Sequence, residues 1–225
     1  MGGAGVSAEL SFTDAFTYAL RGARARVAHS SGRGPSELPV ESWTSPADDD
    51  DHALLDLCDG PTLDVGCGPG RLTHELTLRG HRALGVDVVA EAVNLTRQRG
   101  AEAVVADVFD TVPDEGSWST VLLADGNVGI AGDPARLLRR IREVLRPGGQ
   151  AVVEVAAPGS GSSSGWSTLE VPHGRCRPFR WAFLAVDDVA AVAAAAGMVL
   201  VSAHRLSTLD DAQQARWATV LAEQP

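Results

Sequence analysis

A chain of 225 residues, 44% of them hydrophobic, can bury a sizeable core, and its alternation of apolar helix and strand patterns is consistent with one main domain. Its 19 basic and 29 acidic side chains give a formal net charge of −10, whose field opposes binding to a nucleic-acid backbone. Three cysteines without a C-x-x-C pair favour a reducing compartment over a disulfide framework or a structural zinc site. Because the chain has no run of 18 apolar residues and no signal-peptide core, we expect a cytoplasmic protein that binds neither membrane nor nucleic acid.

The N-terminal part, residues 1–50, predicts a helical cap followed by a connection. Apolar residues recur with helical spacing over residues 7–28, among them Phe12 and Phe16, and this pattern predicts a helix that packs on the domain. Residues 30–51 are rich in Gly, Pro, Ser and Asp and have no period, so they predict a long connection.

Four consecutive acids stand at 48–51. They predict a solvated helix start rather than a metal site, because consecutive carboxylates on a helix point in different directions. No other cluster suggests a metal ligand set, so no metal is expected. The main domain is predicted to run over residues 51–225.

A glycine loop follows the first predicted strand of that domain, in the stretch LDVGCGPGR at residues 63–71. Gly66, Gly68 and Gly70 alternate through the turn, which lets the backbone adopt positive φ and lets a ligand lie against main-chain N–H groups. The helix that begins near Gly70 points its positive end at such a ligand. The sequence therefore predicts a ligand site at this loop.

Two residues of the stretch indicate the kind of ligand. Arg71 stands where a dinucleotide fingerprint needs a small residue for close helix packing, which disfavours a nicotinamide or flavin pyrophosphate. Asp64 would repel a pyrophosphate but can orient an ammonium group, directly or through water. The stretch resembles motif I of the class I S-adenosylmethionine-dependent methyltransferases, (D/E)-x-G-x-G-x-G, and it matches that form without departure.

The following strands each end in a polar residue. Asp87 follows the strand at 82–86, and an acid at this place can accept hydrogen bonds from both ribose hydroxyls of an adenosine. Asp107 follows the strand at 103–106, and Asp125 and Asn127 follow the strand at 119–124. The resemblance implies that Asp107 binds the adenine amino group, although a simple turn acid is the alternative, and that residues 125–127 lie beside the transferred methyl group.

The second half of the chain predicts the remaining elements. Asp133 and Pro134 begin a strongly amphipathic helix, which ends at a Leu-Arg-Pro-Gly-Gly stretch, residues 145–149, before an apolar strand at 151–155. This second stretch also resembles the family. Residues 157–165 predict a Gly/Ser linker, and residues 166–184 an extra hairpin or edge pair.

The resemblance implies a fold and a cofactor. We expect an α/β, Rossmann-like, doubly wound sheet of seven strands, mostly parallel with the last strand antiparallel, carrying an N-terminal helical cap and a small inserted hairpin at about 157–184. The implied cofactor is S-adenosyl-L-methionine. The residues expected to bind it are Asp64, Gly66, Cys67, Gly68, Gly70, Asp87, Val88, Asp107, Val108, Asp125 and Asn127.

The expected reaction is methyl transfer to a small-molecule acceptor on oxygen or nitrogen, because no N-P-P-Y type tetrad follows the fourth strand. The candidate bases are His173 in the insertion and Asp125, and His204 is a lower-ranked candidate. The arginines of the insertion predict either a clamp for an anionic acceptor or a hairpin that pairs with the acidic surface. Two alternatives stay open: an S-adenosylmethionine-binding protein without transfer activity, and a nucleotide-dependent oxidoreductase. The sequence fixes neither the acceptor nor the oligomeric state.

Overall fold

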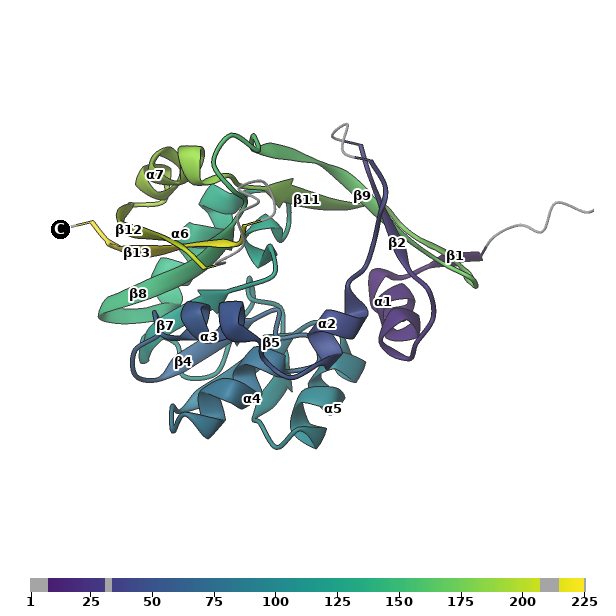
Figure 1. The fold of residues 1–225 in the computed structure, drawn as a ribbon, viewed down its shortest axis with the longest axis horizontal. Coiled ribbons are helices and arrows are strands. Elements are labelled where there is room, and N and C mark those ends of the chain that lie inside the picture. The colour runs from purple at the N-terminus through teal and green to yellow at the C-terminus, as the bar shows by residue number, and fades with distance from the viewer. Residues whose placement is uncertain (1–7, 31–33, 207–214, 225) are drawn as a thin grey trace, which may run out of the picture.

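The computed structural model describes residues 8–30, 34–206 and 215–224, and within them the larger of two sheets has seven strands (Figure 1). This main sheet has the order β12-β13-β8-β7-β4-β5-β6. Strands β4 to β8 run parallel, whereas β13 is antiparallel to both β8 and β12. The predicted fold class is thereby confirmed. The strands are β4 (Thr62–Val65), β5 (Ala83–Asp87), β6 (Ala103–Val105), β7 (Trp118–Leu123), β8 (Leu145–Val155), β12 (Met198–Arg205) and β13 (Trp217–Glu223).

Helices cover both faces of the main sheet. Successive side chains along a buried strand point to opposite faces, so both faces need a cover. On one face, Leu137 and Ile141 of α6 (Pro134–Val144) and Val189 of α7 (Val186–Ala195) share a core cluster with β7 and β8. On the other face, Leu54 of α3 (Asp49–Leu55) and Leu76 of α4 (Arg71–Leu78) form a second cluster. Helix α5 (Ala90–Gln98) contacts α4, β5 and β6. The carboxyl ends of β4, β5 and β7 therefore meet at one edge of a rigid, doubly covered sheet.

A second sheet, which we call the cap sheet, combines strands from two segments that lie far apart in the sequence, the N-terminal segment and the insertion. Its order is β1-β10-β9-β2-β3, and β11 also pairs with β9. The N-terminal segment supplies β1 (Ala8–Leu10), β2 (Arg26–His29) and β3 (Ser36–Glu37), and the insertion supplies β9 (Ser163–Val171), β10 (Gly174–Cys176) and β11 (Phe179–Phe183). The predicted hairpin is thus part of a larger sheet. Figure 1 shows β9 and β11 reaching from the main sheet toward β1 and β2.

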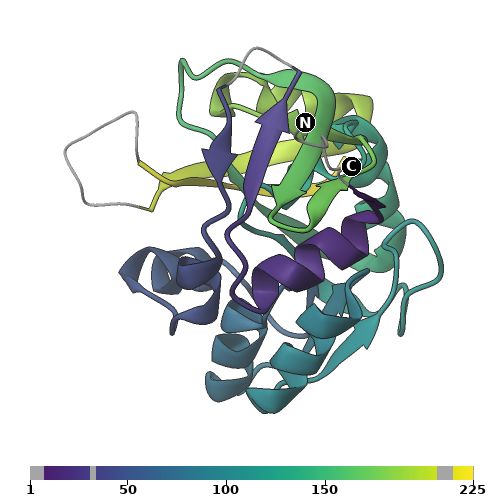
Figure 2. The ribbon, with the colours of Figure 1, turned by 90° about the vertical axis from the view of Figure 1, so that its right-hand side faces the viewer.

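The N-terminal helix is shorter than the sequence predicts. Helix α1 spans Phe12–Leu20, with Ser11 as N-cap accepting a hydrogen bond from the Asp14 N–H at 3.0 Å. Gly22, at φ +92°, lets the chain turn, and residues 26–29 pair with β9 instead of continuing the helix. Helix α1 contacts β9 and β10 on one side and α5 on the other, so it lies between the cap sheet and the main domain (Figure 2).

The connection between cap and main sheet holds two short helices, α2 (Val40–Thr44) and α3. The predicted linker ends earlier than expected, since β9 begins at Ser163. Whether residues 1–50 and 51–225 act as separate domains stays a prediction. No helix in the described part of the chain is both long enough and apolar enough to cross a membrane.

Candidate functional site

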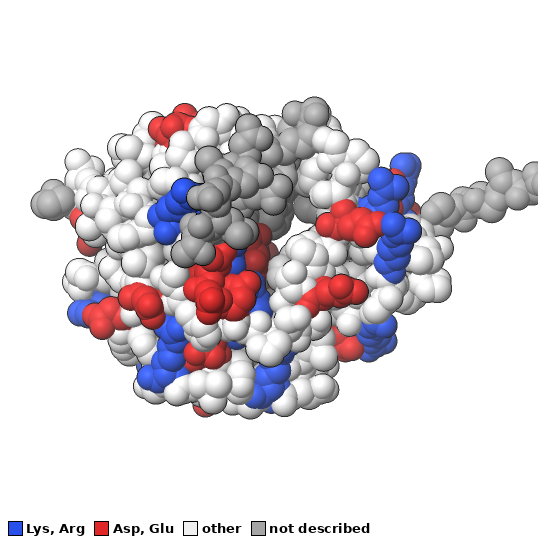
Figure 3. Space-filling model, in the orientation of Figure 1, with Lys and Arg blue, Asp and Glu red and all other residues white. Residues whose placement is uncertain are grey.

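A cavity of about 600 Å³ lies between the carboxyl edge of the main sheet and the cap sheet. In the view of Figure 3 the surface is hollowed between the lobe of the main sheet on the left and the lobe of the cap sheet on the right. Residues of β4, β5 and the loops after β5, β6 and β7 line one wall, and residues of α1, β2, α2 and β11 line the other. A volume of this size is typical of sites for small organic ligands.

The glycine loop forms the floor of the cavity at the end of β4. Gly66 and Gly68 adopt φ values of +73° and +54°, which favour glycine. A Cβ on Gly66 would lie 2.6 Å from Nδ2 of Asn127, whose amide donates to the carbonyls of Val65 and Gly66 at 2.9 and 3.0 Å. A Cβ on Gly68 would meet no protein atom within 4 Å. Gly66 is therefore required for packing inside the protein, whereas Gly68 leaves room on its cavity side.

Asp87 links the glycine loop to the end of β5. Its two carboxylate oxygens accept hydrogen bonds from the Gly68 N–H at 3.0 Å and the Val89 N–H at 2.8 Å. Burial raises the pKa of Asp87, and these backbone N–H groups oppose that rise. At the end of β6, Asp107 accepts from the Phe109 N–H at 2.9 Å. Both carboxylates line the cavity, so two strand tips present acceptors to one ligand.

Asp64 lies behind the glycine loop rather than in the cavity. Only 2% of it is exposed, and its Oδ2 accepts from the Thr73 hydroxyl at 2.6 Å. Burial raises its pKa to about 7, with Thr73 opposing and the charges of Asp125 and Asp87 adding to the rise. The sequence predicts that Asp64 orients an ammonium group directly or through water; its carboxylate lies outside the cavity lining, which does not fit direct contact. The reason is that β4 is covered on both faces and its third residue points into the α4 side.

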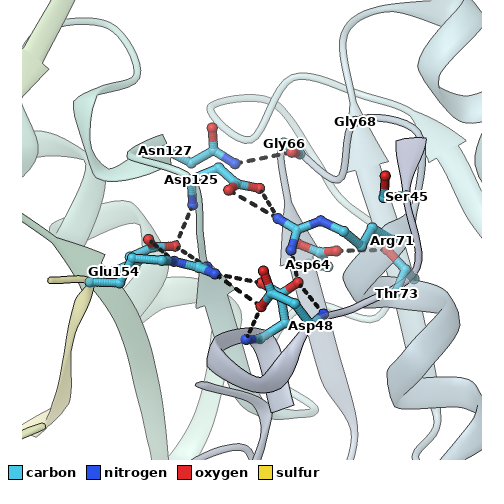
Figure 4. A network of polar contacts seen from close by, with 12 residues as sticks. Ser45, Asp48, Asp64, Gly66, Gly68, Arg71, Thr73, Asp125, Asn127 and Glu154 are labelled. Carbon is cyan, nitrogen blue, oxygen red and sulfur yellow. Dashed lines mark hydrogen bonds and ion pairs between the residues drawn. The ribbon is translucent and has the colours of Figure 1, made fainter. Parts of the chain in front are cut away.

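A buried ion-pair network lies at the end of the cavity, at the position where the sequence predicts Asp64 (Figure 4). Arg71 at the start of α4 pairs with Asp51 and with both oxygens of Asp125, at 3.0 and 2.8 Å. Arg216, just before β13, pairs with Asp51 at 2.8 Å and with Glu154 at 2.8 Å. Asp48 lies 3.6 Å from Arg216 as well, so four carboxylates surround two guanidinium groups, which leaves a formal excess of negative charge beside the glycine loop.

Two details of this network matter for ligands. Arg71 and Asp125 line the cavity, and the Arg71 Nε–H is buried without a hydrogen-bond partner among the described residues. Asp125 sits at φ +51°, a strained backbone position of the kind that functional sites hold. Burial raises its pKa, Glu154 adds to the rise, and Arg71 and Arg216 oppose it.

The acid run at 48–51 is only partly solvated, contrary to the sequence-based interpretation. Asp48 caps α3 in a capping box with Asp51, and the Asp51 side chain is completely buried between Arg71 and Arg216. Acidic side chains over α3 are visible beside the hollow in Figure 3. Burial of Asp51 is possible because two arginines compensate its charge.

Most residues predicted to bind the cofactor line this one cavity. The nine that do are Gly66, Cys67, Gly68, Asp87, Val88, Asp107, Val108, Asp125 and Asn127. Gly70 does not: it caps α4 at φ +84°, and a Cβ there would lie 2.6 Å from the Thr96 side chain. Cys67 is buried, and burial raises the pKa of its thiol well above the usual value, which favours the protonated thiol.

The structure does not bring His173 to the cavity. It lies exposed at the β9–β10 turn, where its ring contacts Tyr18 with centroids 4.6 Å apart. The β9 strand carries this turn away from the main sheet, to the end where β1 pairs (Figure 1). Arg177 pairs with Glu9 on the surface, and of the insertion's arginines only Arg180 lines the cavity. His204 is on β12 with its Nε2 2.8 Å from the Ser202 hydroxyl, outside the cavity lining.

Sequence reasoning missed the cap wall of the cavity. That wall includes Phe12, Phe16, His29, Trp43, Phe179, Trp181 and Phe183. The His29 ring stands edge-on to Phe183, with centroids 5.0 Å apart, and its Nδ1 lies 2.8 Å from the buried Ser167 hydroxyl. The aromatic residues of α1 gave a signal, their i, i+4 spacing, but that spacing does not distinguish packing against a core from lining a cavity.

The comparisons with known proteins agree with the glycine-loop half of this site. A family model described as a methyltransferase domain matches residues 62–149. Trans-aconitate 2-methyltransferase of Paracidovorax citrulli is 33% identical over 97 residues, which are 41% of this chain and 37% of that protein. Ubiquinone biosynthesis O-methyltransferase of Xanthomonas oryzae pv. oryzae is 30% identical over 105 residues, 44% of each chain. The chain spans less than half the length of these curated relatives.

Solved structures agree with the fold as a whole. A SAM-dependent methyltransferase from Bacteroides fragilis, described in complex with S-adenosyl-L-homocysteine, gives a TM-score of 0.75 over 95% of this chain and 94% of that one, at 20% identity. Residues 62–149 therefore match a methyltransferase domain, and the fold around them is that of a SAM-dependent methyltransferase structure. The 1,6-didemethyltoxoflavin-N1-methyltransferase of Burkholderia thailandensis is similar over 88% of this chain and 96% of that one, with a TM-score of 0.59 at 19% identity. The predicted family is thus confirmed, and at these identities the two structures support the shared fold alone.

The glycine loop and the strand tips lie within the matched residues 62–149, whereas the cap sheet is built from segments outside them. In the described residues no group of three or more His, Cys, Asp or Glu side chains is placed to hold a metal ion.

Proposed function

We propose that the protein is a methyltransferase that uses S-adenosylmethionine to methylate a small-molecule acceptor on oxygen or nitrogen. The observation that carries the proposal is the single cavity in which the glycine loop and the polar strand tips face a wall of aromatic side chains. S-adenosylmethionine, when bound, supplies a sulfonium methyl group that is already activated for displacement. The remaining tasks of the chain are to hold both ligands, align them and exclude water.

The residues at the main-sheet wall fit this cofactor. The open space over Gly68 leaves room for a ligand against the main chain. The unpartnered Arg71 Nε–H suits a carboxylate and Asp125 suits an ammonium group, and the methionine moiety carries both. Asp87 would hold the ribose hydroxyls, with Asp107 at the adenine and with Val88 and Val108 against its ring. The excess negative charge of the ion-pair network favours a cationic cofactor.

The opposite wall would hold the acceptor. His29 is an imidazole that lines the cavity, and its contact with Ser167 fixes the ring. We propose His29, in place of His173, as the group that takes the acceptor's proton when the acceptor is protonated. Asp125 is less suited to that role because protonation of its carboxylate would weaken its ion pair with Arg71.

Names of relatives are compatible with this reaction class. The Xanthomonas relative is named an O-methyltransferase and the Burkholderia neighbour an N1-methyltransferase, so both acceptor atoms occur among proteins similar to this one. A cytoplasmic location and the absence of nucleic-acid partners stay predictions from the sequence.

The proposal is tested by calorimetric titration with S-adenosylhomocysteine and by transfer of labelled methyl groups from S-adenosylmethionine to a panel of small hydroxyl and amine compounds. Asp87→Asn removes the carboxylate at the ribose, so the affinity for S-adenosylhomocysteine is expected to fall at least tenfold, which corresponds to about 1.4 kcal/mol. Asp49→Asn, an exposed acid on α3, is the matched control and leaves the affinity unchanged.

Unchanged affinity in a folded Asp87→Asn protein would refute the assignment of the ribose site. Binding of S-adenosylhomocysteine without transfer to any compound would favour the alternative of a binding protein without transfer activity.

A further inference from the structure

The cap wall contains an unusual share of the chain's aromatic residues. All five phenylalanines of the sequence line the cavity, together with Trp43 and Trp181. Phe109 follows β6 on the cofactor side. The other six come from α1, α2 and β11 and face the glycine loop across the cavity; we call them the aromatic wall: Phe12, Phe16, Trp43, Phe179, Trp181 and Phe183.

Five of the six rings of the aromatic wall form a connected array, and the sixth, Phe183, contacts the His29 ring. Trp43 stacks on Phe16 at 5.8 Å between centroids, Phe16 lies 5.5 Å from Phe12, and Phe12 meets Phe179 edge-on at 4.9 Å. Phe179 in turn stands edge-on to Trp181 at 6.2 Å. Each ring is thus held by its neighbours in a fixed orientation, which preserves the faces and edges that it presents to a ligand.

None of these rings is fully buried, although each lies within the folded molecule. All six residues are half-buried, and they line the cavity rather than the closed core of the main sheet. Apolar surface left facing a water-filled space is unfavourable, so a ligand that covers the wall gains its binding free energy from that surface.

Few polar groups accompany the aromatic wall on the cap side. Arg180 donates to the Ser164 hydroxyl and lies over the outer Trp166 ring, and Glu37 is paired with Arg24. His29 is held by Ser167 and by the edge of Phe183. An anionic acceptor clamped by several arginines, one of the two interpretations of the sequence, does not fit this wall.

We infer that the acceptor is a flat, largely apolar aromatic compound whose ring lies against the aromatic wall and whose single polar group is directed toward His29. This inference rests on the proposed function, because it names the acceptor of that reaction. Planar rings match the faces and edges of fixed aromatic side chains, whereas a saturated ring of the same size covers the same area without that match.

The experiment compares two probes that share a fused two-ring carbon skeleton and one hydroxyl group, one of them aromatic and flat, the other saturated and puckered. Binding of 2-naphthol and of its saturated counterpart decahydro-2-naphthol is measured by ligand-observed NMR and calorimetry, on the protein alone and on the protein saturated with S-adenosylhomocysteine. We expect 2-naphthol to bind at least tenfold more tightly than the saturated alcohol, with displacement of neither probe by S-adenosylhomocysteine.

Two substitutions locate the site. Phe16→Leu and Trp181→Leu keep apolar side chains but remove rings, so each is expected to reduce the preference for 2-naphthol at least threefold. Trp166→Leu is the matched control, because Trp166 is 53% exposed and lies outside this cavity, and it leaves the preference unchanged.

Equal binding of the two probes, or no binding of 2-naphthol, would overturn the inference. A loss of preference in Trp166→Leu alone would also overturn it, by placing the probe on the outer face of the cap sheet. Failure of the proposed function has a different signature, since it removes S-adenosylhomocysteine binding or methyl transfer and leaves the probe measurements on the protein alone intact.

Discussion

Asp51 is the residue whose replacement tests the ion-pair network most sharply. Its side chain is completely buried and accepts from Arg71 and from Arg216, while its carboxylate also accepts from the Asp48 N–H at 3.0 Å. Asp51→Ala leaves two guanidinium groups with one partner fewer, and the Arg71 side chain is only 6% exposed. Removal of one member of a buried ion pair costs about 3–5 kcal/mol.

For a chain of this length, about 2–4 °C of melting temperature correspond to each kcal/mol, so Asp51→Ala is expected to melt roughly 6–20 °C lower. The matched control is Asp49→Ala, which removes an exposed acid from the same first turn of α3 and stays within about 0.5 kcal/mol of the parent. The assay is thermal unfolding followed by circular dichroism, with calorimetry for S-adenosylhomocysteine at a temperature where both variants are folded. Equal melting temperatures for the two variants would refute the reasoning that Asp51 compensates buried arginines.

Three further predictions concern the cavity. Gly68→Ala is expected to fold and to bind S-adenosylhomocysteine at least tenfold more weakly, because its Cβ meets no protein atom but faces the ligand. Gly70→Ala is expected to lose stability in a urea titration, because its Cβ meets Thr96. Equal stability of the two variants would contradict this prediction. Burial raises the pKa of Asp64 to about 7, so the folded protein keeps a proton that the unfolded chain releases from about pH 4. The free energy of unfolding therefore falls as pH rises between these values. Asp64→Asn is expected to remove this fall, which parallel urea titrations of parent and variant at pH 5 and pH 8 measure. His29→Gln is expected to lower kcat with little change in cofactor affinity, and a variant with the parent's kcat and pH profile would exclude His29 as the proton acceptor.

The main sheet and the cofactor side of the cavity could be predicted from the sequence because their signals are local. Buried parallel strands appear as short apolar runs, and the residue that follows each run lies at the ligand edge whatever the rest of the chain does. Asp87 and Asp107, which follow such runs, line the cavity as this pattern predicts, and their contacts with the cofactor stay predictions. The position of Asp64 behind the glycine loop could not be predicted, because the strand pattern does not tell which residues at the end of a doubly covered strand face the cavity.

The cap sheet could not be predicted because its pairing partners lie far apart in sequence. Residues 26–29 continue an apolar helical pattern, and only the presence of β9, about 140 residues later, makes a strand the better state for them. For the same reason His29 was overlooked and His173 was chosen. The burial of Asp51 depends on Arg216, 165 residues away, so its run of acids looked solvated.

The central claim is that the cavity edge at β4, β5 and β7 binds S-adenosylmethionine and not a dinucleotide. A competition titration tests it most directly: S-adenosylhomocysteine is titrated calorimetrically into the protein with and without an excess of NAD. The account predicts one S-adenosylhomocysteine per chain with an affinity that NAD does not change. Displacement of S-adenosylhomocysteine by NAD, or the absence of any S-adenosylhomocysteine binding, would contradict it.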